Sequence, residues 1–135
     1  MTDSEKFKGR QDLAVKFGLS SEDRLFHKAF DCTMIKKGAK GSKGVYANSA
    51  LATVGDGVLK LYFAKSFFNE DENSGEITRK RIEQEKDKAL KEKAEKQGFP
   101  RLRYGEKAKE SDKLNSDFAT LFEAVVGAIF FDGRI

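Results

Sequence analysis

The chain has 135 residues, of which 39% are hydrophobic and 36% charged, so we expect residues 1–135 to form one globular domain and not a disordered chain. The formal net charge of +4 is compatible with a polyanionic partner but does not require one. The single cysteine, Cys32, excludes an intrachain disulfide and a zinc site made of cysteines, and with no recognisable signal peptide it predicts a cytoplasmic protein. No apolar stretch is long and charge-free enough to span a membrane, so we expect no membrane partner.

Apolar residues at helical spacing predict two short helices near the N-terminus, at residues 4–19 and 20–31. The first ends at Gly18, a residue type that favours helix termination. The second begins after a cap at Ser20 or Ser21, followed by acidic residues.

Residues 34–44 form a basic loop in which lysine and glycine alternate without helical or strand periodicity. Two interpretations stay open for it: a solvated flexible loop, or an arm that contacts the phosphates of a nucleic-acid duplex. The candidate contacts in this loop are Lys36, Lys37, Lys40 and Lys43.

Residues 46–68 predict a long helix with an apolar stripe. The stripe consists of Leu51, Val54, Val58, Leu61 and Tyr62. This helix contains Gly55, Asp56 and Gly57 in the middle of its apolar run, where two glycines each cost about 1 kcal/mol relative to alanine.

The second half of the chain predicts a polar turn at 69–76, a charged helix at 77–98, a loop at 99–113 and a last helix at 114–133. The last helix is apolar nearly all round, so we expect it to be central. No internal repeat and no convincing alternating strand is present, so we expect an all-α domain of about five to seven helices. The loop carries a second group of candidate phosphate contacts, Arg101, Arg103 and Lys107.

Each of the two most apolar helices carries one acid, Asp56 in the first and Glu123 in the last. A buried carboxylate needs a partner, a metal ion or a raised pKa. If the two acids face one another, they can hold a hard divalent cation through oxygen ligands. The alternative is local pairing, of Asp56 with Lys60 one turn later and of Glu123 with its own neighbours.

Two stretches resemble the signatures of the ribonuclease III family. NSALATVGD (48–56) is similar to the signature Glu-x-Leu-Glu-Phe-Leu-Gly-Asp, and LFEAVVGAIFFDG (121–133) resembles Phe-Glu-Ala-Leu-Ile-Gly-Ala-Ile-Tyr-Leu-Asp-Gly. The resemblance covers roughly residues 20–134 in the right order and spacing. It implies a helical endonuclease domain that acts as a homodimer and hydrolyses phosphodiester bonds of double-stranded or structured RNA with Mg²⁺ or Mn²⁺.

Carried over residue by residue, the resemblance implies that Asp56 and Glu123 are catalytic and ligate the metal. The chain departs from the usual acidic cluster at Ala52 and Thr120, where the family has a glutamate and an aspartate. It also carries Lys60 where the family often has an acid; this lysine competes with a metal for Asp56 or contacts RNA phosphate.

The departures at these positions follow a subfamily pattern. LATVGD (51–56) and ATLFEA (119–124) resemble Mini-ribonuclease III, which lacks a separate double-stranded-RNA-binding domain and still cleaves RNA. This resemblance implies ribosomal RNA precursor as the substrate. The alternative is a catalytically impaired dimer that binds RNA without cutting it.

Overall fold

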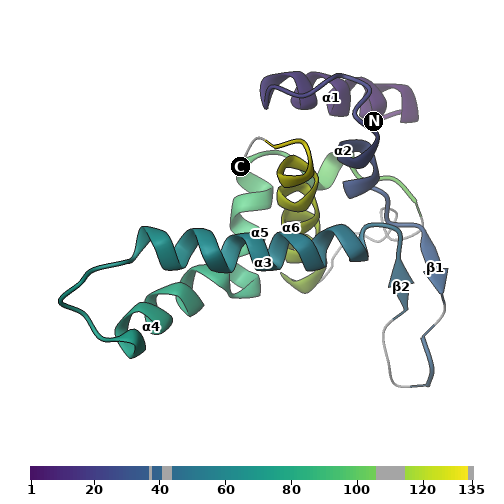
Figure 1. Cartoon of the computed structure of the whole chain (residues 1–135). Helices are drawn as coiled ribbons and strands as arrows, with labels where there is room; N and C mark the ends of the chain where they lie inside the picture. The colour runs from purple at the N-terminus through teal and green to yellow at the C-terminus, as the bar shows by residue number, and fades with distance from the viewer. Residues whose placement is uncertain (37, 41–43, 106–114, 134–135) are drawn as a thin grey trace.

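The structure is a computed structural model that describes residues 1–36, 38–40, 44–105 and 115–133, the first two residues of the last segment by their backbone only (Figure 1). In chain order its elements are α1 (Asp3–Lys16), α2 (Arg24–Ala29), β1 (Met34–Lys36), β2 (Val45–Tyr46), α3 (Ser49–Ser66), α4 (Ser74–Glu85), α5 (Asp87–Lys96), the 3₁₀ turn η1 (Pro100–Leu102) and α6 (Asn115–Phe131). The six α-helices confirm the expected all-α fold. No helix within these ranges is long and apolar enough to cross a membrane.

The centre of the fold is the crossing of α3 and α6, and α5 and α2 also pack on α6. Figure 1 shows α3 in front of α6, with α4 beside the C-terminal half of α3 and the β-hairpin next to its N-terminal end. The core around α6 contains aromatic side chains from α2 and from the segment before η1, with Phe26, Phe30 and Phe99 at most 2% exposed. A smaller cluster lies between α3 and α5, where Leu59 and Phe63 meet Leu90.

Glycines allow α3 and α6 to approach until their backbones touch. A Cβ atom at Gly55 would overlap the backbone carbonyl of Glu123, and a Cβ at Gly127 would overlap the carbonyl of Leu51. By contrast, a Cβ at Gly57 would meet nothing within 4 Å. Of the two glycines that flank Asp56, only Gly55 is therefore required for the close helix crossing.

The prediction of one continuous charged helix at 77–98 is wrong, because the structure divides this segment into α4 and α5. The chain breaks at Lys86, whose φ and ψ of −66° and 152° are extended. α4 buries no residue, whereas α5 buries Leu90 and Ala94 against the core. The change of direction thus brings α5, which carries Leu90 and Ala94, onto α6 and leaves α4 beside α3.

Two further expectations differ from the structure. The apolar stripe predicted on the long helix is rotated, because Leu61 and Tyr62 are 73% and 56% exposed while Leu59 and Phe63 are buried. Both sides of this helix are apolar, so periodicity alone does not identify the inner one. The helix at 20–31 is shorter than expected: it begins after Asp23, whose side chain accepts a hydrogen bond from the Phe26 amide at 2.8 Å.

Strand β1, at the start of the basic loop, pairs with β2, directly after the loop, in a short antiparallel hairpin that strand patterning did not predict. Met34 pairs with Tyr46 and Lys36 with Val45, with an irregularity between the two pairs. The strands are only three and two residues long, too short for an alternating pattern to emerge.

Candidate metal-binding site

The α3–α6 crossing brings together the two acids that the sequence singles out. Asp56 follows Gly55 on α3, and the backbone of Glu123 on α6 lies directly against Gly55. Both acids line one open cavity of about 330 Å³. The departures from the usual acidic cluster, Ala52 and Thr120, line this same cavity, together with Ser49 and Thr53.

The two carboxyl groups interact directly. Burial, a side-chain hydrogen bond with Asp56 and the charge of Asp56 raise the pKa of Glu123 to about 8, with a smaller contribution from Asp87. At neutral pH the Glu123 carboxyl is therefore mostly protonated, because its ionisation would place a negative charge in a largely buried position and beside Asp56. A proton and a metal cation relieve the same repulsion.

Lys60 provides the second partner of Asp56. Its Nζ lies 3.0 Å from Asp56 Oδ2, one turn along α3, and the two side chains are about half exposed. The hydrogen bond and charge of Asp56 raise the pKa of the Lys60 ammonium. The two sequence interpretations of Asp56 therefore coexist: it pairs locally with Lys60 and also faces Glu123.

The donor set at this site consists of two carboxylates. Within the described ranges, no group of three or more His, Cys, Asp or Glu side chains is arranged to hold a metal ion. Magnesium usually keeps several water ligands and binds through one or two carboxylates. Asp56 and Glu123, which share a hydrogen bond in an open cavity, fit that requirement.

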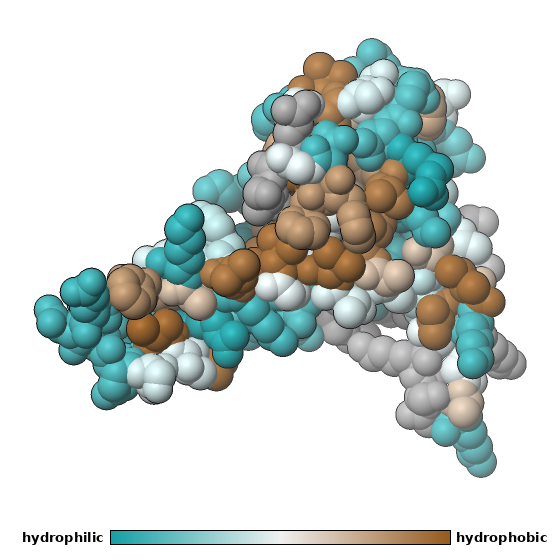
Figure 2. All heavy atoms as spheres, viewed as in Figure 1, coloured by the Kyte–Doolittle hydropathy of each residue, from teal (hydrophilic) through white to brown (hydrophobic). Residues whose placement is uncertain are grey.

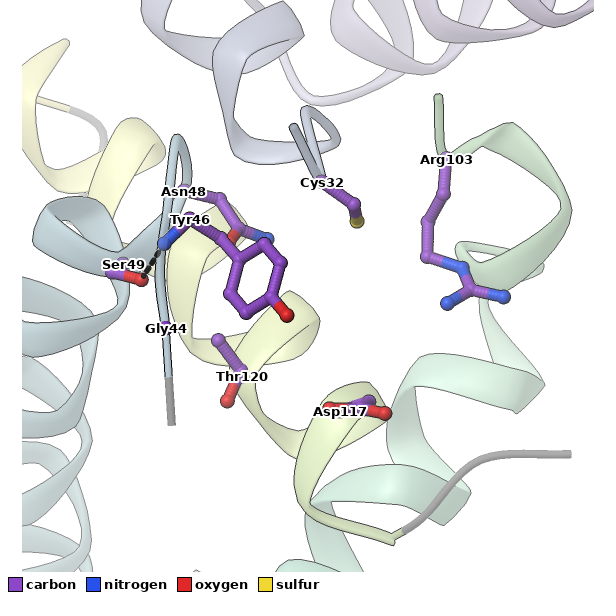
Figure 3. Close-up of a pocket in the computed structure, with 8 residues that line it drawn as sticks. All are labelled: Cys32, Gly44, Tyr46, Asn48, Ser49, Arg103, Asp117 and Thr120. Atoms are coloured by element: carbon purple, nitrogen blue, oxygen red, sulfur yellow. Dashed lines mark hydrogen bonds between the residues drawn. The ribbon is translucent and has the colours of Figure 1, made fainter. Parts of the chain in front are cut away.

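A second, smaller cavity of about 110 Å³ adjoins the first and shares Ser49 and Thr120 with it. Figure 3 shows the Arg103 guanidinium on one side of this cavity, Tyr46 on the opposite side and Asp117 between them at the bottom of the view. Its remaining lining residues are Cys32, Gly44 and Asn48.

The predicted phosphate contacts occupy different environments. Lys36, Lys40 and Arg101 are exposed, as a contact to an RNA backbone requires. Arg103 is only 7% exposed: its Nε donates to the Pro100 carbonyl at 2.9 Å and its guanidinium stacks on the Phe118 ring at 4.8 Å. The predicted contacts Lys37, Lys43 and Lys107 lie outside the described residues.

One acid near the site escaped the sequence analysis. Glu85 ends α4, and burial raises the pKa of its carboxyl, with the charge of Asp56 acting in the same direction. Its side chain is 12% exposed and forms an ion pair with Arg81. In the sequence Glu85 is one of many charged residues in a segment that mixes acidic and basic side chains, so no pattern distinguishes it from the other acids there.

A comparison with protein families agrees with this geometry. A family model described as Ribonuclease III domain matches residues 49–134, which include α3, α6 and every residue of the cavity. The chain belongs to the ribonuclease III family. Comparisons with curated proteins and with solved structures return no significant match.

Proposed function

We propose that this protein is a Mg²⁺- or Mn²⁺-dependent endoribonuclease that hydrolyses phosphodiester bonds in double-stranded or structured RNA. The observation that carries the proposal is the convergence of Asp56 and Glu123 at an open cavity, within the part of the chain that matches the family. The motif pattern around Ala52 and Thr120 favours a Mini-ribonuclease III type of enzyme, with ribosomal RNA precursor as substrate. The cytoplasm is the compartment that we propose for it.

Asp56 and Glu123 would hold the divalent cation, which supplies water activation and stabilisation of the leaving oxygen when bound. Glu123 must release its proton to become a ligand, so cation binding is coupled to proton release and weakens at low pH. Ser49 and Thr120 also line this cavity, and the Ser49 hydroxyl accepts a hydrogen bond from the Tyr46 amide at 3.0 Å. The openness of the cavity suits an RNA backbone that passes across the surface.

Exposed basic side chains outside this cavity support RNA binding. Lys36 and Lys40 extend from the hairpin region, and Arg101 lies in η1. Lys60 pairs with Asp56, which lines the cavity, and is a candidate phosphate contact. Each contact to phosphate releases counterions, so we expect RNA affinity to fall steeply with salt.

We further propose a homodimer, supported by apolar side chains that the single chain leaves exposed. Figure 2 shows brown, apolar residues gathered on the face that carries α3. Leu61, Tyr62 and Phe131 are each more than half exposed. Phe131 also lines a mainly apolar cavity of about 250 Å³ with Leu25 and Val54. A symmetric partner would cover such a surface and place two sites on the two strands of a duplex.

The test is incubation of the purified protein with double-stranded RNA and Mg²⁺, beside Asp56→Ala and Glu123→Ala variants. We expect cleavage by the wild type, no cleavage by either variant, and loss of activity on chelation of the metal. Cleavage that persists in both variants would contradict the assigned site.

The second candidate function is an RNA-binding dimer that does not cut. Three features favour it: two acids of the usual cluster are replaced by Ala52 and Thr120, and Lys60 already pairs with Asp56. RNA binding by the wild type without cleavage in either Mg²⁺ or Mn²⁺ would support this candidate and exclude the first.

A further inference from the structure

The inference concerns what happens to Lys60 when a cation enters the site, and it rests on the proposed metal-dependent function. The Lys60 ammonium lies 3.0 Å from an oxygen of Asp56, the carboxylate that would ligate the metal. An ammonium and a divalent cation compete for the same carboxylate oxygens. A cation that binds Asp56 must therefore displace the Lys60 ammonium. The displaced ammonium moves either into solvent, which weakens metal binding, or to a second acceptor nearby.

Glu85 provides an acceptor of this kind. Its Oε2 atom is shielded from solvent and has no hydrogen-bond partner among the described residues. The Arg81 Nε atom forms an ion pair with this oxygen at 3.3 Å but does not make a hydrogen bond to it. A buried carboxylate oxygen that lacks a hydrogen bond is costly, so a donor that reaches it is stabilised there.

The positions of the charges link the three groups. Glu85 acts electrostatically on Lys60, and Asp56 and Lys60 both act on Glu85. Lys60 belongs to α3, and α4, which ends at Glu85, packs against this helix. Its long aliphatic stem carries the ammonium on rotatable bonds, so a change of rotamer moves the charge without moving the backbone.

We propose that Lys60 transfers its ammonium from Asp56 to Glu85 when a divalent cation binds at Asp56 and Glu123. The lysine then stays at the rim of the cavity as a second positive charge. In this position it is available to a phosphate of the bound RNA. Glu85 is a positioning residue in this scheme, since it acts on the metal site only through Lys60.

The test is calorimetric titration of the intact protein with Mn²⁺ in the absence of RNA. Lys60→Gln removes the competing ammonium and is expected to tighten Mn²⁺ binding about two- to fivefold, the strength of an exposed ion pair. Glu85→Gln removes the second acceptor, leaves Lys60 on Asp56, and is expected to weaken Mn²⁺ binding by a similar factor. Lys60→Arg keeps the charge and is expected to remain close to the wild type.

The double variant Lys60→Gln with Glu85→Gln separates transfer from simple charge effects. Once Lys60 is absent, Glu85 has no ammonium to accept, so we expect Glu85→Gln to change Mn²⁺ affinity by less than about 1.5-fold. Such a non-additive result indicates that the two residues are coupled, whereas additive effects would indicate that they act independently. Lys65→Gln and Glu83→Gln make the same charge changes at exposed positions on the same helices and serve as controls.

Equal weakening by Glu85→Gln in both backgrounds would overturn the proposal, because Glu85 would then act by its own charge. Unchanged Mn²⁺ affinity in Lys60→Gln would also overturn it. Failure of the proposed function has a different signature: no Mn²⁺ binding by the wild type, or binding that survives Asp56→Asn combined with Glu123→Gln.

Discussion

Substituting alanine for Gly55 and for Gly57 tests whether the site depends on backbone contact between two helices. The two glycines lie two residues apart on α3 and flank Asp56. At Gly55 the new methyl group would overlap the backbone carbonyl of Glu123, whereas at Gly57 it would enter open space. The same chemical change is therefore expected to have opposite effects on stability.

The expected magnitudes follow from two opposing contributions. Alanine gains about 1 kcal/mol over glycine in a helix interior, and this gain is realised in full at Gly57. At Gly55 the overlap is with backbone, which cannot move aside as a side chain can, so overpacking costs about 3 kcal/mol and the net loss is about 2 kcal/mol. At about 4 °C per kcal/mol for a domain of this size, Gly57→Ala raises the Tm by about 4 °C and Gly55→Ala lowers it by about 8 °C.

Thermal and urea unfolding followed by circular dichroism at one fixed protein concentration measures both effects. Cleavage and metal binding are measured on the same samples. Gly55→Ala pushes Glu123 away from Asp56, so we expect it to lose both activities even below its Tm. A Gly55→Ala variant as stable as Gly57→Ala would refute the reasoning. If Gly57→Ala keeps its stability but loses RNA affinity, the open space at Gly57 is occupied by the substrate.

Three further predictions follow from individual contacts. Folding raises the pKa of Glu123 from 4.5 to about 8. Between these pH values the folded wild type therefore holds a proton on Glu123 that the unfolded chain has released. Its unfolding free energy relative to Glu123→Gln should therefore fall as the pH rises from 5 to 8, by on the order of 1–2 kcal/mol after solvent screening, as urea titrations without metal can measure. Arg103→Ala should lower the unfolding free energy by about 1–3 kcal/mol, since it removes a partly buried hydrogen bond to Pro100 and a contact with the Phe118 ring. Arg101→Ala, at an exposed position, should change the unfolding free energy by less than about 0.5 kcal/mol. Lys36→Gln and Lys40→Gln should each reduce the slope of log affinity against log salt by about 1 if they contact phosphate; an unchanged slope in a mobility-shift assay would exclude that contact.

Much of the fold could be predicted from the sequence, because its long helices are strongly periodic. The last helix, apolar nearly all round, is indeed central. The break at Lys86 could not be foreseen: neither glycine nor proline marks it, and it arises because Leu90 packs on α6 whereas α4 buries nothing. The sequence also does not reveal which face of the long helix points to the core. Leu59 and Leu61 are equally apolar, and only packing makes Leu59 buried and Leu61 exposed.

The candidate site was partly accessible to sequence reasoning. An acid inside each of two apolar helices already suggested a shared role for Asp56 and Glu123, and the family resemblance specified it as a metal site. Chain topology then determines that the two helices cross at Gly55, with both acids at one cavity. The place of Glu85 depends on the α4–α5 break, so local sequence carries no sign of it.

Crystals of the protein soaked in Mn²⁺ offer the most direct test of the central claim, that Asp56 and Glu123 form a divalent-metal site at the helix crossing. Anomalous scattering locates manganese independently of any interpretation of the surrounding density. We predict a peak between the two carboxylates, about 2.0–2.3 Å from an oxygen of each, as is usual for hard divalent cations. An empty cavity at a Mn²⁺ concentration that supports RNA cleavage, or a peak at other residues, would contradict the account.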